Sequence, residues 1–235
     1  MSLSDNITLV KEKIAAAATA AGRAPSEVTL VAATKTQTSD TIRAAIAAGI
    51  TVCGENRVQE LTSHLEDNAY EGAALHFIGH LQTNKVKYIV GKVDLIESVS
   101  SLRLLDAIEA QAAKLNVVQD VLLEVNVGRE EAKSGFLPEE LPAGVKYAAV
   151  LPHIRLRGLM AIPPVAVERG DNLPYFVEMR QLLVDTQNIL GNNVSDVNSL
   201  SMGMSGDFED AVSAGATLVR VGTAIFGARP PRSMG

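Results

Sequence analysis

The fold is decided by the stretch Thr29-Leu30-Val31-Ala32-Ala33-Thr34-Lys35, a short apolar run that ends in polar residues. Successive residues of a strand point to opposite faces of a sheet, so a run that is apolar throughout predicts a strand buried on both faces. Such strands are typical of a parallel sheet covered by helices. Similar runs follow along the chain, and the eight predicted strands are Thr29–Thr34, Thr51–Gly54, Ala74–Ile78, Leu95–Ser98, Val121–Asn126, Ile154–Ala161, Ser199–Met202 and Thr217–Val221.

Segments rich in Ala and Leu, with apolar residues at helical spacing, separate these runs. Four of them lie between predicted strands, and three of the four end at a glycine, the residue favoured just after a helix C-terminus. These predicted helices are Ser39–Ala48, Leu102–Leu115, Tyr175–Leu190 and Asp207–Ala214. A further helix, Ile7–Ala21, is predicted before the first strand.

Eight strands with helices between them in 235 residues predict an α/β fold, a (β/α)8 TIM barrel with an extra N-terminal helix. An open doubly wound sheet is the alternative, but no GxGxxG motif follows the first predicted strand. No linker divides the chain, so we expect a single domain over residues 1–235, with its barrel core at about 29–229. The longest irregular stretch, Gly128–Gly144, would follow the fifth strand and could act as a lid.

Composition and charge argue against several classes of function. The net charge is −6, aromatic residues make up 4% of the chain and Trp is absent, which disfavours a nucleic-acid-binding surface. The longest stretch without Asp, Glu, Lys or Arg, Gly72–Asn84, falls short of the roughly 18 apolar residues of a membrane helix. The first residues lack the apolar segment of a signal peptide, so we expect a cytoplasmic protein without a membrane partner.

Cysteine and histidine usage argues against a disulfide framework and a metal site. Cys53 is the one cysteine, and its place within an apolar run predicts a core residue. The four histidines show no metal-ligand spacing. We therefore expect no bound metal.

The C-terminal ends of barrel strands carry the active residues of this fold. Lys35 follows the first apolar run at such an end. Dry surroundings lower the pKa of a lysine, and the neutral amine can attack a carbonyl carbon. The alternative is a lysine that extends past the strand end into solvent.

Arg220 lies inside the predicted strand Thr217–Val221, and a buried guanidinium needs partners. It could pair with Glu124 or Glu55 as a purely structural feature. It could equally donate to a ring nitrogen or an anionic ligand. The residues alone leave these alternatives open.

Small residues follow the last two predicted strands, in the segment Ser201–Gly206 and at Gly222 and Thr223. Loops at these places often bind phosphate in TIM barrels, because glycine lets backbone N–H groups approach and a helix N-terminus favours negative charge. Ordinary turns, with Ser205 or Asp207 as a helix N-cap, are the alternative. Asn56, after the second strand, could hydrogen-bond a ligand.

Several segments resemble the pyridoxal-phosphate homeostasis proteins, also called the YggS/PROSC family. The similar segments occur in order from about Leu30 to Arg229. They are Leu30–Lys35, Gly54–Glu60, His76–Lys85, Lys133–Phe136, Gly158–Ala161, Leu200–Ser205 and Arg220–Gly227. The resemblance implies a barrel like the N-terminal domain of alanine racemase that holds pyridoxal 5′-phosphate (PLP) as its cofactor. It also implies that Lys35 forms the Schiff base and that Arg220 faces the pyridine nitrogen. The implied phosphate-binding candidates are Ser201, Ser205, Gly222 and Thr223, with Asn56 nearby.

The resemblance also implies a role in the control of free PLP rather than a defined reaction. A permanently charged arginine at the pyridine nitrogen disfavours protonation of that nitrogen and so weakens carbanion chemistry. The related racemases take a second acid/base, a tyrosine, from another domain and a partner subunit, whereas the tyrosines here lie away from predicted strand ends. We therefore expect a monomeric PLP carrier without substantial catalysis, with PLP-dependent apoenzymes as possible acceptors. A weak racemase-like enzyme is the alternative.

Overall fold

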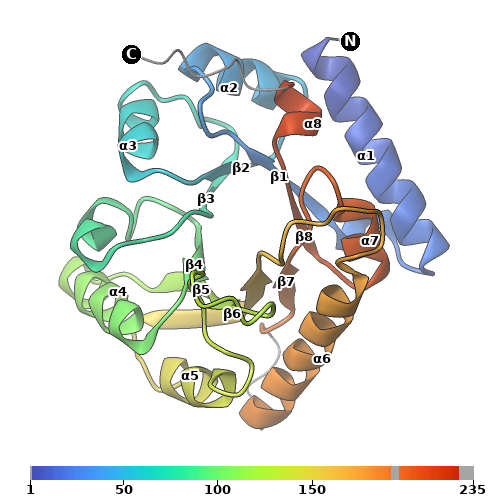
Figure 1. The fold of residues 1–235 in the computed structure, drawn as a ribbon. Helices are drawn as coiled ribbons and strands as arrows, with labels where there is room; N and C mark the ends of the chain where they lie inside the picture. The colour runs from blue at the N-terminus through green and yellow to red at the C-terminus, as the bar shows by residue number, and fades with distance from the viewer. Residues whose placement is uncertain (1, 192–195, 228–235) are drawn as a thin grey trace.

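The described part of the chain, residues 2–191 and 196–227 of a computed structural model, forms a closed barrel of eight parallel strands (Figure 1). The strands follow one another around the barrel in chain order, and the last pairs with the first. They are β1 (Thr29–Ala33), β2 (Val52–Glu55), β3 (Ala74–Phe77), β4 (Leu95–Val99), β5 (Gln119–Val125), β6 (Ile154–Ala161), β7 (Ser199–Ser201) and β8 (Leu218–Val221). The predicted (β/α)8 barrel is confirmed. Residues 228–229 of the predicted core lie outside the described residues.

Helices surround the barrel and fill the connections between its strands (Figure 1). They are α1 (Leu3–Ala20), α2 (Ser39–Ala47), α3 (Val58–Glu66), α4 (Leu102–Leu115), α5 (Leu141–Ala148), α6 (Leu173–Leu190), α7 (Phe208–Ser213) and α8 (Thr223–Phe226), with 3-10 helices η1 (Pro25–Glu27) and η2 (Thr83–Tyr88). The short η2 occupies the connection between β3 and β4, where this fold ordinarily has an α-helix. The extra helix α1 packs beside α7 and α8.

The start of α1 and the end of the irregular stretch after β5 differ from their expected positions. Helix α1 begins at Leu3 rather than Ile7, because the Ser2 hydroxyl and the Asp5 carboxylate each accept a hydrogen bond from the other's backbone N–H. The irregular stretch expected to run to Gly144 ends at Leu141, where α5 begins. Helix α5 places Gly144 against the ring of Phe136, a contact that a side chain at position 144 would crowd.

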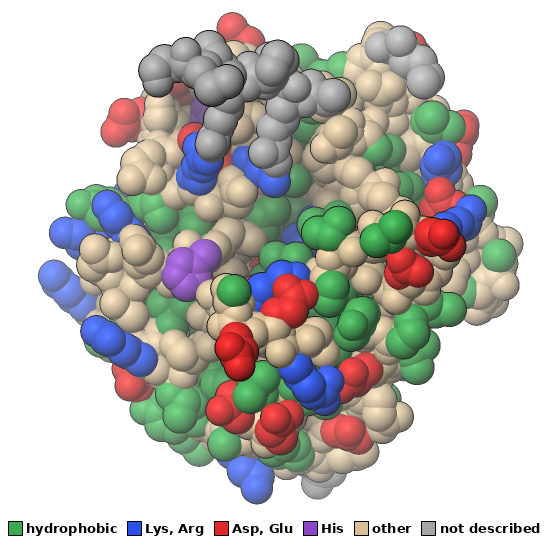
Figure 2. Space-filling model, viewed as in Figure 1, with side chains coloured by type: hydrophobic (Ala, Val, Ile, Leu, Met, Phe, Trp, Pro, Cys, Tyr) green, Lys and Arg blue, Asp and Glu red, His purple; other side chains and the backbone are tan. Residues whose placement is uncertain are grey.

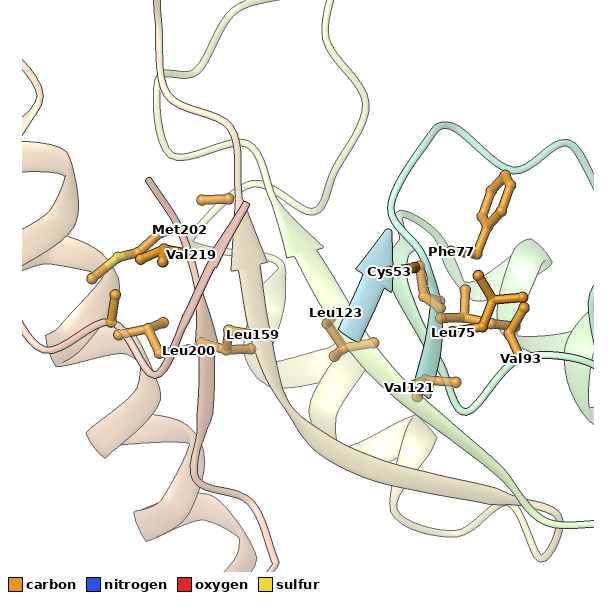
Figure 3. Close-up of a cluster of buried hydrophobic side chains, with 14 of the residues drawn as sticks. Cys53, Leu75, Phe77, Val93, Val121, Leu123, Leu159, Leu200, Met202 and Val219 are labelled. Carbon is orange, nitrogen blue, oxygen red and sulfur yellow. The ribbon is translucent and has the colours of Figure 1, made fainter. Parts of the chain in front are cut away.

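The strands carry two apolar layers, one on each side of the barrel wall. The outer layer lies between strands and helices, and Figure 3 shows part of it, including Cys53, Leu123 and Val219. Cys53 is fully buried, as expected of a core residue, and burial raises the pKa of its thiol to about 12. The inner layer is a separate cluster of six buried residues: Val31, Val52, Leu95, Leu122, Met160 and Leu218.

Leu122 and Leu123 belong to different layers because neighbouring strand residues point to opposite faces. The same alternation sends Glu124 to the inside of the barrel, above Leu122. Among the described helices, none combines the length and apolar character needed to cross a membrane.

Strand β6 contains a bulge next to β5, and Gly158 lies at it with a φ of +151°. A Cβ atom at this position would lie 1.8 Å from the carbonyl oxygen of Ser199 on β7. Glycine is therefore required both by the backbone conformation and by the approach of the neighbouring strand.

We predict that Gly158→Ala lowers the free energy of unfolding by about 3 kcal/mol, because it combines backbone strain with a backbone clash. Urea unfolding followed by circular dichroism measures this change. The matched control is Gly206→Ala, where a Cβ meets no atom within 4 Å and stability should stay within about 0.5 kcal/mol of wild type. Equal urea midpoints for the two variants would contradict the prediction.

Candidate functional site

A cavity of about 580 Å³ lies at the C-terminal ends of the strands. Its lining comes from every strand or strand end except β4, because parallel strands in a closed barrel end at the same face. The polar and glycine residues that line it are Lys35, Asn56, Gly79, His80, Glu124, Asn126, Lys133, Ser134, Ser205, Gly206, Arg220, Gly222 and Thr223. Six of the seven predicted site residues are thus brought together around one cavity. Ser201 is the exception.

Ser201 is fully buried and lies below the cavity. Its hydroxyl donates to a carboxylate oxygen of Glu97, on β4, and accepts a hydrogen bond from Arg220, on β8. Ser201 therefore points inward among buried polar groups and does not line the cavity, and its expected contact with a ligand phosphate stays a prediction.

Arg220 is held inside the barrel by partners on three other strands. Its Nη1 donates to Ser201 and lies 3.8 Å from Oε2 of Glu97, and its Nη2 donates to the carbonyl oxygen of Ala161 at 2.8 Å. His76, on β3, completes this group with its Nδ1 at 2.7 Å from Oε1 of Glu97. The polar layer of the barrel, as we call His76, Glu97, Ser201 and Arg220, separates the apolar inner cluster from the cavity.

The ion-pair partner of Arg220 is Glu97, not Glu124 or Glu55 as the sequence suggested. Glu124 acts on Arg220 only by its charge. Glu55 faces the outer layer, where it accepts hydrogen bonds from Thr34 at 3.1 Å and from Tyr70 at 3.4 Å. Its other oxygen accepts from the backbone N–H of Asn56 at 2.8 Å, so Glu55 fixes the turn that presents Asn56 to the cavity.

Burial acts in opposite directions on the charges of the polar layer. Desolvation by itself would raise the pKa of Glu97, but hydrogen bonds from His76 and Ser201 and the charges of His76 and Arg220 bring that pKa below its ordinary value. Desolvation lowers the pKa of Arg220, and the charges of the nearby carboxylates act in the opposite direction. A guanidinium remains charged in proteins, so the layer holds a fixed positive charge under the cavity.

Glu124 has the opposite electrostatic environment, because it is buried without a hydrogen-bond partner for its Oε2 atom. Desolvation raises the pKa of Glu124 to about 7, although the charge of Arg220 acts in the other direction. The Oδ1 atom of Asn56 is a second buried polar atom without a partner. Buried polar atoms are rarely left unpaired, so these two atoms mark the cavity as a place that a polar ligand completes.

Lys35 is half-buried in the cavity wall after β1. The next residue, Thr36, has a φ of +65°, which a β-branched residue rarely adopts. The backbone N–H of Thr36 donates to Glu60 on α3 at 2.8 Å and so holds the turn in this conformation. Strain of this kind clusters at functional sites.

The loops after β7 and β8 meet at one side of the cavity. The Ser205 hydroxyl accepts long hydrogen bonds of 3.3 Å from the backbone N–H groups of Gly222 and Ala224, at the start of α8. Asp207 is engaged elsewhere, because its carboxylate accepts from the backbone of Met204 and from the side chain of Asn172, both at 2.7 Å. Asp207 therefore bonds groups outside the N-terminus of α8, and the Ser205 hydroxyl accepts the hydrogen bonds at that N-terminus.

The loop after β5 crosses the mouth of the cavity. Its Ser134 hydroxyl lies 3.0 Å from Nδ1 of His80 after β3, and Lys133 donates to the carbonyl oxygen of Pro163 after β6 at 3.2 Å. Lys133 also lines the cavity. Figure 2 shows acidic side chains gathered over the segment between β5 and α5, and basic ones over η2.

Sequence reasoning missed three features of this site. Glu97 and His76 lie within strands rather than at their ends, and Glu124 was weighed only as a partner for Arg220. The signal that could have found them is an ionisable residue at an inward position of a predicted strand. Within residues 2–191 and 196–227, no group of three or more His, Cys, Asp and Glu side chains could hold a metal ion.

Comparison with known proteins places this barrel in a family. Residues 8–230 match the family model described as alanine racemase, N-terminal domain. The pyridoxal phosphate homeostasis protein of Aquifex aeolicus is 45% identical over 97% of this chain and 99% of its own length. The chain belongs to the pyridoxal phosphate homeostasis protein family. The Escherichia coli K12 family member is 39% identical over 97% of both chains.

A solved family member has the same fold. PipY of Synechococcus elongatus, determined with PLP bound, is 30% identical, with a TM-score of 0.82, covering 96% of this chain and all of PipY. The pyridoxal phosphate homeostasis protein fold expected from the sequence is thus confirmed for this chain.

We predict that Arg220→Glu lowers the free energy of unfolding by about 3–5 kcal/mol, because it buries a third carboxyl group near Glu97 and Glu124 and removes their cation. Arg220→Gln should cost less, since glutamine adds no charge. Adding Glu97→Gln to Arg220→Gln should recover part of the loss, because no unpaired carboxylate then remains in the polar layer. Urea unfolding at neutral pH measures all three variants. An unchanged midpoint for Arg220→Glu would show that position 220 is not buried as described.

Proposed function

We propose that the cavity holds pyridoxal 5′-phosphate and that the protein stores and exchanges this cofactor without substantial catalysis. The observation that carries this proposal is that Lys35 and Arg220 line the same cavity. Lys35 supplies an amine that can react with the aldehyde of the cofactor. Arg220 supplies a fixed cation whose N–H groups can donate to the pyridine nitrogen. PipY, solved with PLP bound, and the names of the curated relatives support the choice of cofactor.

The residues around the cavity fit the cofactor's remaining groups. The phosphate oxygens of the cofactor can accept hydrogen bonds from the backbone N–H groups of Gly222 and Ala224. These N–H groups donate to the Ser205 hydroxyl at 3.3 Å, which is long for a hydrogen bond. Ser205, Gly222 and Thr223 are therefore the proposed phosphate site. Asn56 offers an amide whose oxygen lacks a partner, and we assign it to a polar group of the cofactor.

Bound PLP supplies an electron sink for carbanions, and Arg220 limits that chemistry here. A permanent cation against the ring nitrogen disfavours a proton on that nitrogen. The loop after β5 lines part of the cavity. We infer a carrier that exchanges PLP with its surroundings, with PLP-dependent apoenzymes as acceptors and the monomer as the working unit. The cytoplasmic location stays a prediction.

A weak racemase-like activity is the second candidate function. One observation favours it: Glu124 is an acid that lines the same cavity as Lys35, with a pKa raised by burial to about 7. Racemisation needs two acid/base groups, and a pKa near the working pH suits such a group. Against this candidate, the fixed charge of Arg220 weakens carbanion stabilisation.

We predict that borohydride treatment of the PLP-loaded protein fixes a pyridoxyl group on Lys35, because this lysine follows β1 in the cavity wall, whereas the amine of Lys133 is bonded to the Pro163 carbonyl and to Glu130. Peptide mass mapping locates the group. Lys35→Ala should lose the visible absorption of the loaded protein, and the control Lys87→Ala, an exposed lysine on η2, should keep it. A pyridoxyl group bound at wild-type stoichiometry in Lys35→Ala would contradict the assignment of Lys35.

The carrier and the racemase differ in turnover. We predict that the PLP-loaded protein interconverts alanine or serine enantiomers more slowly than about 1 s⁻¹, the low end of ordinary enzyme turnover. Chiral chromatography of amino acids incubated with the protein measures the rate. Sustained turnover above this value, lost in Lys35→Ala and reduced in Glu124→Gln, would favour the racemase over the carrier.

A further inference from the structure

Glu124 is the one acidic residue in the described cavity lining, and a pure anion-binding site does not explain it. Its side chain is 8% exposed and lines the cavity, and its Oε2 atom has no hydrogen-bond partner. The other buried acid that faces the barrel interior, Glu97, is fully bonded within the polar layer. The Oε2 atom of Glu124 can therefore form a hydrogen bond with a ligand that fills the cavity.

The charged groups around Glu124 come from several elements. Arg220 on β8 acts on it by charge, and Lys35 after β1, His80 after β3 and Lys133 after β5 line the same cavity. On β6, the residue in register with Glu124 is the uncharged Met160. Glu97 on β4 is neutralised by its own partners. Glu124 is thus the single acid in a described cavity lining that is otherwise basic or neutral.

The two protonation states of Glu124 have opposite effects on an anion. An ionised carboxylate repels a phosphate or a phenolate oxygen, and the repulsion is strong because the site is partly desolvated. A protonated carboxyl group has an O–H that donates a hydrogen bond to the same oxygen. The neutral form is therefore the one that binds an anionic ligand.

We propose that Glu124 makes the hold on the cofactor depend on pH, because its protonated carboxyl donates a hydrogen bond to an anionic oxygen of the cofactor and its ionised form weakens binding. This inference rests on the proposed function. It adds that ionisation of Glu124 in the cavity favours release of the cofactor from the carrier.

The direction in which the Kd changes with pH follows from the linkage between ligand binding and protonation of Glu124. Burial raises the pKa of Glu124 to about 7 in the empty cavity, and a bound anion raises the pKa further. Below about pH 7 the group is protonated with or without ligand, so it adds no pH dependence. Above about pH 7 the ligand must take up a proton to bind, so the Kd rises about tenfold per pH unit until the pKa of the complex is reached.

The test uses pyridoxine 5′-phosphate, which carries an alcohol in place of the aldehyde and so forms no covalent bond with Lys35. Its Kd is measured by calorimetry at about pH 6 and about pH 8.5, in wild type and in Glu124→Gln. Glutamine has the shape of the protonated acid and does not titrate. Glu131→Gln, on the exposed part of the loop after β5, is the control with the same change of net charge.

We expect equal Kd values for wild type and Glu124→Gln at the lower pH, and about thirtyfold weaker binding by wild type at the higher pH. Glu131→Gln should follow wild type. The other groups around the cavity are the same in wild type and in both variants, so the ratio of Kd values isolates Glu124. Wild type should also take up close to one proton per ligand at the higher pH, a readout that needs no variant.

Two results would overturn the inference. A ratio of wild-type to Glu124→Gln Kd values that does not change with pH would show that Glu124 does not sense the ligand. Failure of Glu124→Gln to fold, together with no proton uptake by wild type, would lead to the same conclusion. If wild type binds neither PLP nor pyridoxine 5′-phosphate at either pH, the proposed function itself fails. Binding of PLP with an unchanged ratio overturns this inference and leaves the proposed function standing.

Discussion

A guanidinium buried in the centre of the barrel is the constraint on which the rest of the site depends. Arg220 is only 4% exposed, so the protein must provide most of its hydrogen-bond acceptors and its counter-charge. Glu97 provides the charge, and Ser201 and the Ala161 carbonyl provide acceptors. These groups belong to four different strands, so the position of one charge ties β4, β6, β7 and β8 together.

The alternation of strand residues turns this constraint into a layered interior. Apolar side chains fill the lower part, the polar layer lies above them, and the cavity lies above the polar layer. Glu97 and Glu124 both point inward from neighbouring strands, yet their pKa values are shifted in opposite directions. Hydrogen bonds and a close cation stabilise the charge on Glu97, whereas desolvation without a partner opposes the charge on Glu124. The same barrel wall thus favours the charged form of one carboxyl group and the neutral form of the other, a difference set by environment alone.

The strands and the identity of the cavity residues at strand ends could be predicted from the sequence, because apolar runs and their polar ends are local signals. Helices α3 and α5 could not. Arg57 makes no capping bond at the start of α3, and α5 contains Pro142 and Gly144, so packing against Phe136 outweighs its weak helical propensity. The partner of Arg220 was also out of reach, because Glu97 lies in mid-strand and meets Arg220 only when the barrel closes. The depth of Ser201 was out of reach for a related reason: the direction of its side chain is a local signal, but its depth in the barrel depends on the stagger of the strands.

The pairing of β1 with β8 has a consequence for how the protein is made. Lys35 follows the first strand and Arg220 lies in the last, so the cavity exists only after the two ends of the barrel have met. A nascent chain that has not yet released β8 from the ribosome lacks both the closed wall and the buried cation. Ligand binding therefore cannot assist the early steps of folding, and such long-range closure is slow compared with local helix formation. Occupancy of the cavity reports a finished barrel.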